Sequence, residues 1–175
     1  MSVLSYKTAI KRFCLLVALP LLLTACNSNP HPKLLSEQNY SLEYDEDWYL
    51  DNYDEDFDPD YYFLISSKEQ DAFVSMFFYD GPVDAAALLQ EKLKQHAGQT
   101  ISVERQQSMD TWGNYKGKGV ELEGKLLGAE KAILTLFVHS DKQTSFMVVT
   151  QVLSTDKKKY RKSFDLVKNS FKLKN

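Results

Sequence analysis

The chain has 175 residues, of which 24 are acidic and 21 are basic, for a formal net charge of −3. This length allows one domain with a substantial apolar core, and the acidic balance argues against a general nucleic-acid-binding protein. With only two cysteines, Cys14 and Cys26, the chain has no disulfide framework of the kind that holds small secreted domains together.

The N-terminal residues have the order of a bacterial export signal. Three basic residues within 7–12 precede an apolar run over 13–23, which is shorter than the roughly 20 residues that span a bilayer. The run ends in Leu-Thr-Ala-Cys, which resembles the lipobox of bacterial lipoproteins. The resemblance implies a signal peptide over 1–25, cleavage before Cys26, and membrane attachment through acyl chains on Cys26. An ordinary signal peptide with a chance cysteine is the alternative.

The residues after the cysteine predict a flexible tether over 26–38, because Pro30 and Pro32 interrupt any periodicity. Counted from Cys26, 18 basic residues face 24 acidic ones, so the net charge becomes −6. In enterobacterial lipoproteins an aspartate directly after the cysteine favours the inner membrane, whereas this chain has Asn27. The resemblance therefore implies an outer-membrane location facing the periplasm, with the inner membrane as the alternative.

The first half of the remaining chain predicts strands around an acidic loop. Alternating apolar residues predict a strand over Tyr40–Tyr44. Residues 43–60 carry many carboxylates and no basic residue, and such like charges favour an exposed loop. Two strands follow at 61–66 and 72–79, with a polar turn at 67–71 between them.

The next elements are a helix and four strands. Asp84 is expected to cap a helix over 85–97 that ends at Gly98. Strands are predicted at 101–109, 115–124, 129–139 and 144–153. The second of these contains Gly117 and Gly119, which indicate a close backbone approach.

The last predicted helix follows a capping cluster at 154–156. Tyr160, Phe164, Val167 and Phe171 recur at helical spacing and are expected to form its buried face. The opposite face is basic and consists of Lys157, Lys158, Arg161, Lys162 and Lys168.

This order of elements predicts an α+β fold, in which a mainly antiparallel sheet is flanked by helices, over a single domain at 39–175. Together with the lipobox, it resembles the DcrB-like lipoproteins and the wider PsbP-like fold, an α/β/α sandwich. The segments that carry the resemblance are Tyr40–Tyr44, Val83–Leu93, Gly117–Gly119 and Phe164–Leu173. The acidic insert over 45–60 departs from the family, which has a short turn there.

The acidic insert is a candidate cation site. Asp54, Asp56, Asp58 and Asp60 alternate as at the start of a calcium-binding loop, but Pro59 and Ile65 occupy the positions where an EF-hand requires Gly and Glu. We therefore expect no specific metal site and no cofactor. Weak cation binding is the alternative.

Two surfaces are candidate contacts for a partner. Tyr53 lies in the acidic loop, and Lys158, Arg161 and Lys162 lie on the last helix, where they could meet an envelope protein, a glycan or anionic headgroups. The alternatives are that both surfaces are simply solvated, or that the acidic loop packs against this basic helix. Trp48 and Phe57 are expected to fold back onto the edge of the sheet.

No catalytic motif is present, and His31, His96 and His139 are scattered over different predicted elements. The sequence therefore predicts a lipid-anchored, non-catalytic binding or adaptor domain in the bacterial envelope. One alternative is an envelope enzyme with a non-local site, in which His139 or His96 lies near a carboxylate. The other is a cation-binding module.

Overall fold

The computed structural model describes residues 31–51, 58–96 and 100–174. The predicted signal peptide, Cys26, Tyr53, Asp54, Asp56, Phe57 and Gly98 lie outside these ranges. Within the described part of the chain, no helix is long and apolar enough to cross a membrane.

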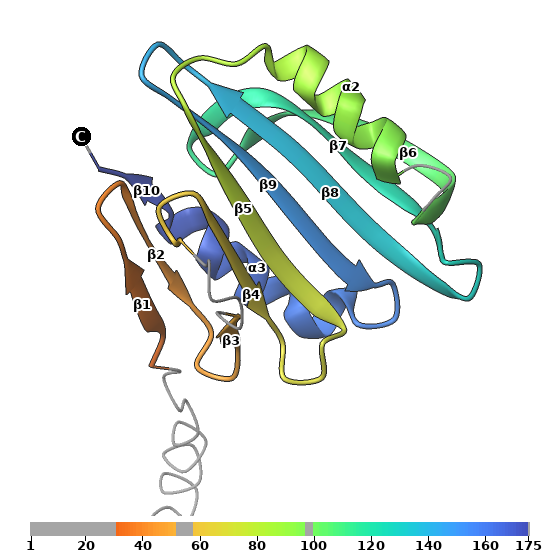
Figure 1. Ribbon diagram of the computed structural model, residues 1–175. Coiled ribbons are helices and arrows are strands. Elements are labelled where there is room, and N and C mark those ends of the chain that lie inside the picture. Colours follow the sequence, from red (N-terminus) through yellow and green to blue (C-terminus); the bar gives the residue numbers. More distant parts are fainter. Residues whose placement is uncertain (1–30, 52–57, 97–99, 175) are drawn as a thin grey trace, which may run out of the picture. The chain divides into compact units, whose positions relative to one another are not determined.

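A seven-stranded antiparallel sheet forms the centre of the described domain (Figure 1), in the order β3-β4-β5-β9-β8-β7-β6. Neighbouring strands in this sheet are also neighbours in the chain except for β5 and β9, which pair across the intervening helix and three strands. The strands are β3 (Tyr49–Asp51), β4 (Tyr62–Ser66), β5 (Ala72–Asp80), β6 (Ile101–Trp112), β7 (Tyr115–Leu126), β8 (Glu130–Ser140) and β9 (Thr144–Leu153).

A second, three-stranded sheet has the order β1-β2-β10 and consists of β1 (Lys33–Ser36), β2 (Tyr40–Tyr44) and β10 (Lys172–Leu173). The predicted unpaired tether is therefore wrong for Lys33–Ser36. Leu35 pairs with Leu42 and is only 7% exposed. Leu34 and Leu35 are too short an apolar run to indicate a strand from sequence. The strand forms because it pairs with β2, and the sequence does not show this pairing.

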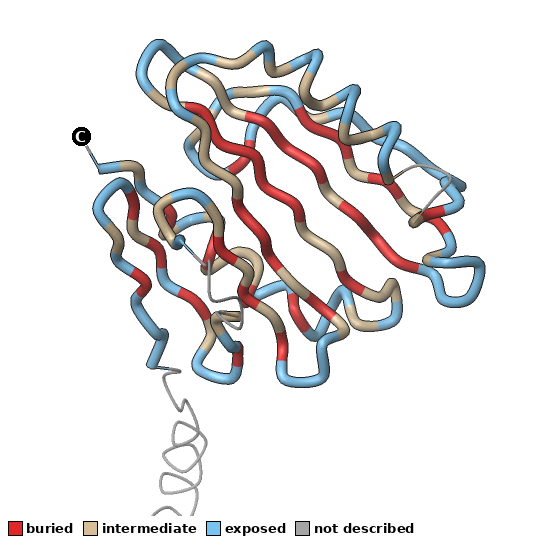
Figure 2. Tube along the Cα trace, in the orientation of Figure 1, coloured by how far each residue is buried: buried red, intermediate tan, exposed pale blue. Residues whose placement is uncertain are grey.

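The two helices cover opposite faces of the large sheet, as Figure 1 shows. Helix α2 (Ala85–His96) packs on β7 and β8, and helix α3 (Lys157–Ser170) packs on β2 and β9. Side chains alternate along each strand between the two faces, so each face has its own apolar core. The buried residues are concentrated in the strands (Figure 2). The predicted α+β fold class is confirmed.

Several local predictions are also confirmed. The carboxylate of Asp84 accepts hydrogen bonds from the backbone N–H groups of Ala86 and Ala87, at 3.0 and 3.1 Å, as an N-cap does. At Gly117 a Cβ atom would lie 2.1 Å from the carbonyl oxygen of Val138. The predicted close backbone approach at this glycine is therefore real.

Candidate binding groove beneath helix α3

A groove of about 320 Å³ lies between α3 and the large sheet. Its floor contains Val74, Trp112, Ile133 and Val152, each at most 7% exposed, which come from four different strands. They share one face of the sheet because strand residues alternate between faces. The floor is therefore apolar and contributed by residues far apart in the sequence.

One row of this floor is polar. Thr135 on β8 lies directly opposite Thr150 on β9, and Glu121 on β7 lies opposite Thr135. All three residues line the groove. No hydrogen bond joins either threonine hydroxyl to another described residue, so both hydroxyls can interact with a bound molecule.

Charged side chains of α3 form the rim of the groove. Lys157 lies 3.6 Å from Glu121, while Arg161 and Lys168 share Asp165 at 3.7 and 3.1 Å. Three cations thus face two carboxylates. Arg161 has the longest of these contacts and its side chain is 81% exposed, so solvent screens its attraction to Asp165.

The N-terminal end of α3 is fixed by contacts away from the groove. Trp48, 2% exposed, packs edge-on against the rings of Tyr160 and Phe164, with centroids 5.8 and 5.4 Å away. The Tyr160 hydroxyl donates a hydrogen bond of 3.0 Å to Glu69. Lys159 pairs with Glu69 and Asp71 at 3.6 and 3.5 Å.

The C-terminal end of α3 is fixed at the β6–β7 hairpin. Gly113 in this hairpin lies so close to α3 that an added Cβ would be 2.4 Å from the carbonyl oxygen of Lys168. Phe171, directly after the helix, is 1% exposed and packs on Trp112. Both ends of α3 are therefore fixed to the rest of the domain, and the groove lies between the helix and the large sheet.

The contacts at the N-terminal end of α3 also shift ionisation. Hydrogen bonding from Tyr160 is the main reason that the pKa of Glu69 lies below its ordinary value. Burial raises the pKa of Asp71, but the nearby Tyr160 hydroxyl, the hydrogen bond from Ser67 and the charge of Lys159 outweigh it, so the net direction is also downward. Both carboxylates are therefore held in the charged form.

The predicted partner-facing residues of the last helix separate in the structure. Arg161 lies on the groove rim, whereas Lys158 and Lys162 are exposed and lie outside the groove. Trp48 folds back as expected, but its ring packs on α3. The alternative in which the acidic loop packs against this helix is met at one described point, Asp45, whose carboxylate accepts a 2.7 Å hydrogen bond from Ser163. Ser163 is not one of the basic residues of the helix.

The described part of the acidic loop forms a turn. The Asp58 carboxylate accepts a 3.0 Å hydrogen bond from the backbone N–H of Asp60, and its carbonyl accepts from the N–H groups of Tyr61 and Tyr62. Among the described residues, no three His, Cys, Asp or Glu side chains are placed to hold a metal ion together. Asp54 and Asp56 lie outside that search.

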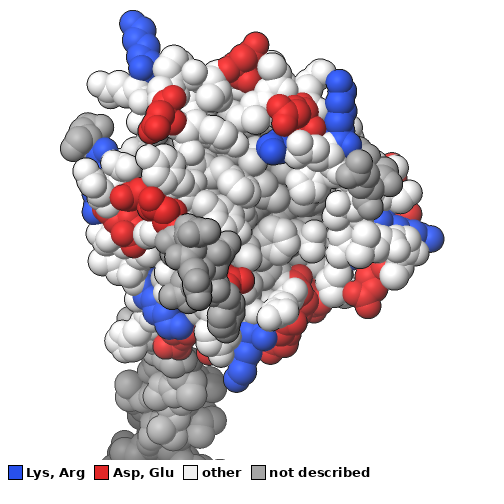
Figure 3. All heavy atoms as spheres, in the orientation of Figure 1, with Lys and Arg blue, Asp and Glu red and all other residues white. Residues whose placement is uncertain are grey.

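The opposite face of the large sheet is less charged. Figure 3 shows the side covered by α2, where the centre is largely uncharged and the acidic and basic side chains lie towards the margin. Phe73, Phe77 and Tyr79 on β5 are partly buried there against the core beneath α2. The combination of an apolar floor, free hydroxyls and cations at the rim belongs to the α3 side.

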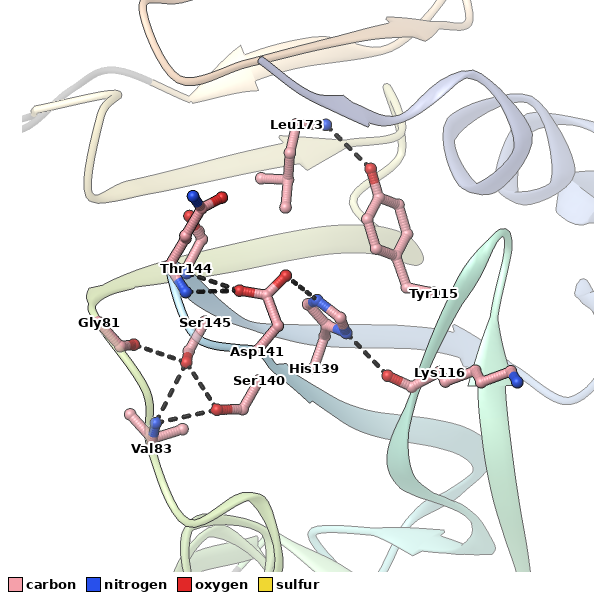
Figure 4. Close-up of polar contacts among 11 residues, drawn as sticks. Gly81, Val83, Tyr115, Lys116, His139, Ser140, Asp141, Thr144, Ser145 and Leu173 are labelled. Atoms are coloured by element: carbon pink, nitrogen blue, oxygen red, sulfur yellow. Dashed lines mark hydrogen bonds and ion pairs between the residues drawn. The ribbon is translucent and has the colours of Figure 1, made fainter. Parts of the chain in front are cut away.

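His139 lies at the end of the β8–β9 hairpin (Figure 4). Its Nδ1 is 2.7 Å from the carbonyl oxygen of Lys116, and its Nε2 is 3.4 Å from a carboxylate oxygen of Asp141. The imidazole packs against Tyr115 and Phe146, with centroids 5.2 and 5.0 Å away. Because both nitrogens are engaged and the side chain is 12% exposed, this geometry gives His139 a structural role.

His96, at the end of α2, has a different environment. Its Nδ1 is buried without a hydrogen-bond partner among the described residues. Burial, and then the charge of Lys92, lower its pKa. Among the described residues no carboxylate is paired with His96, so of the two histidines in the enzyme alternative His139 is the one near a carboxylate.

Sequence reasoning missed the groove. It placed Thr135 and Thr150 in predicted strands and gave them no separate role. The available signal was Thr135 between Leu134 and Leu136, together with Thr150 after Val149, because both are polar residues within otherwise apolar strands. Only the register places these threonines side by side.

No family model and no curated protein matches the chain. Several solved structures resemble it, among them these three. Cyanobacterial PsbP (CyanoP) from Synechocystis is 13% identical over 87% of this chain and 99% of its own, with a TM-score of 0.52. LpqN, which is involved in cell envelope biogenesis of Mycobacterium tuberculosis, is 12% identical over 85% and 93%, with a TM-score of 0.43. A protein from Bacteroides thetaiotaomicron is 13% identical over 78% of this chain, which spans 45% of that protein, with a TM-score of 0.49.

The similarity to CyanoP, at this identity, shows a PsbP-like fold. Its match covers nearly all of both chains, so the likeness extends over the whole domain rather than one motif. Fold similarity does not transfer an activity, because unrelated functions occur on one fold. Function must therefore be argued from this chain's own residues.

Proposed function

We propose that the protein is a lipid-anchored bacterial envelope lipoprotein of the DcrB-like type, with a non-catalytic binding or adaptor domain in the periplasm. The observation that carries the proposal is Leu23-Thr24-Ala25-Cys26 directly after a basic segment and a short apolar run. Asn27 after the cysteine favours the outer membrane, and the inner membrane is the alternative.

The folded domain supports a binding role in two ways. It has a PsbP-like fold with a groove beneath α3, a type of concave site that holds ligands. The histidine–carboxylate pair His139–Asp141 is engaged at the β8–β9 hairpin. The partner proposed for the adaptor role is an envelope protein or a glycan.

The anchor can be tested by labelling cells with radioactive palmitate. We expect the wild-type chain to incorporate label and the Cys26→Ser variant to incorporate none, because the serine hydroxyl does not replace the acylated thiol. Cys14→Ser is the matched control, since Cys14 lies within the apolar run, and this variant should label normally. Equal labelling of Cys26→Ser and wild type would refute the anchor.

The adaptor role can be tested by crosslinking in intact cells, followed by identification of the captured envelope components by mass spectrometry. We expect a reproducible partner that is lost when the cells are lysed in detergent before the crosslinker is added. A chain that crosslinks only to itself would contradict the adaptor role and leave the anchor result unaffected.

A further inference from the structure

We infer that the groove beneath α3 binds a small amphipathic anion, such as a fatty acid, with the apolar chain on the sheet and the acidic group at the helix rim. This names a ligand class for the binding domain proposed above. The inference depends on the geometry of the groove and not on how the protein is anchored.

The size and floor of the groove suit an apolar chain. Ligand sites in proteins range upward from about 300 Å³ and are mostly apolar, and this groove measures about 320 Å³. Trp112, Ile133 and Val152 supply apolar contacts from three strands. These side chains are already nearly buried, so the apolar area removed from water on binding comes chiefly from the acyl chain.

The rim suits an anion. Lys157, Arg161 and Lys168 all line the groove, and the two carboxylates there leave one positive charge in excess. This local excess stands within a domain whose overall charge is acidic. Arg161 can exchange its weak contact with Asp165 for a carboxylate of a ligand, which it can bind through two parallel hydrogen bonds.

Thr135 and Thr150, which lie opposite each other on β8 and β9, determine the orientation of the ligand in the groove. The hydroxyls of Thr135 and Thr150 are adjacent and can each donate a hydrogen bond. They lie on the same face as the apolar floor and open towards the helix, where the cations are. A molecule with an apolar body and one anionic end satisfies the floor, the hydroxyls and the rim at once, whereas a cationic end would meet a rim with one positive charge in excess.

The test uses the full chain in phosphatidylcholine nanodiscs with a decanoic acid that carries a photoreactive diazirine at its chain end. After irradiation, peptide mapping should place the label on β6, β8 and α3 residues that line the groove. Excess decanoate should remove the label, and the same excess of decyltrimethylammonium should not. Label spread evenly over the domain, or removed equally by both competitors, would overturn the inference.

Two variants of one helix sharpen the test. Arg161→Gln removes a rim charge and should weaken competition by decanoate by about fivefold, a typical value for one exposed ion pair. Lys162→Gln is the matched control, because Lys162 is exposed on the same helix outside the groove, and it should leave competition unchanged. Equal effects of the two substitutions would contradict the proposed orientation.

A third variant fills the groove. Thr150→Phe places a ring over the floor and should reduce labelling at least tenfold, while Lys162→Gln retains it. A separate arm replaces phosphatidylcholine by phosphatidylglycerol. Blocked labelling there would identify bilayer lipid as the source of the anion, and retained labelling would identify a free fatty acid. Failure of the palmitate experiment at Cys26 would not alter either result.

Discussion

At the scale of single residues, Gly113 determines how closely α3 approaches the β6–β7 hairpin. Its φ of +57° lies in the left-handed region, and an added Cβ would be 2.4 Å from the Lys168 carbonyl oxygen. Both conditions favour glycine. The residue therefore holds the hairpin turn and the helix end together.

We predict that Gly113→Ala lowers the free energy of unfolding by about 3 kcal/mol, because backbone strain and a steric clash add. Gly81→Ala is the control, since Gly81 has a φ of +73° but nothing within 4 Å of its added Cβ. That substitution should cost only about 1–2 kcal/mol. Urea denaturation of both variants measures the difference. Equal losses of unfolding free energy would show that α3 shifts to accommodate the added Cβ and that the predicted clash is absent.

The carboxylates at the N-terminal end of α3 predict a pH dependence. The folded-state pKa values of Glu69 and Asp71 lie below the ordinary values of 4.5 and 3.8. Their stabilisation is therefore present above those ordinary values and is lost as the pH falls through the lower folded-state values. Thermal melting between pH 6 and 3 should show a smaller decrease for Asp71→Asn than for wild type. The exposed Glu130→Gln variant should behave as wild type, and an unchanged slope for Asp71→Asn would contradict the assignment.

At the scale of elements, β1 is the strand whose role was not expected. It pairs along its whole length with β2, from Lys33 opposite Tyr44 to Ser36 opposite Ser41. Within it, Leu35 is buried and Leu34 is exposed. The described domain therefore begins closer to the proposed anchor than the predicted boundary at 39.

This arrangement predicts different effects for two adjacent leucines. Leu35 is 7% exposed and Leu34 is 68% exposed. Leu35→Ala should lower the free energy of unfolding by about 2–3 kcal/mol, because it removes buried methyl groups and leaves a cavity. Leu34→Ala should change it by less than about 0.5 kcal/mol. If both substitutions change the free energy of unfolding by the same small amount in chemical denaturation, residues 33–36 do not pack on the domain and the predicted tether is correct.

At the scale of the whole domain, the two helices are bound to the sheet unequally. Helix α2 has no fully buried side chain, whereas α3 buries Tyr160, Ser163 and Val167. In Figure 2 the trace of α2 is intermediate or exposed, whereas the strands beneath it contain buried residues. Elements with few buried contacts open at low free energy, so α2 should be the less stable layer.

Amide hydrogen exchange tests this ranking under native conditions. We predict that amides in α2 exchange at least about tenfold faster than amides in α3, and faster still than those of β8 and β9 at the centre of the sheet. Leu89→Ala should widen the gap by weakening the packing of α2. Equal protection of the two helices from exchange would contradict the ranking and show that partial burial stabilises α2 as much as α3.

Much of the fold was predictable because its signals are local. The β8–β9 hairpin follows from two long apolar runs around a polar turn, and Asp84 marks the start of α2 within three residues. The groove was not predictable in the same way. Thr135 and Thr150 come together only through strand register, and Arg161 differs from Lys162 only through how α3 is rotated against the sheet.

The sequence by itself determined the order of the longer strands and the two helices, the α+β class and the candidate lipid anchor, because alternation, capping and the lipobox each depend on neighbouring residues. The tertiary structure decided which strand pairs with β2, which cations of α3 face the sheet, and that the helix is fixed at its ends over an open groove. These features depend on contacts between residues as far apart as Gly113 and Lys168, and no local pattern encodes such contacts.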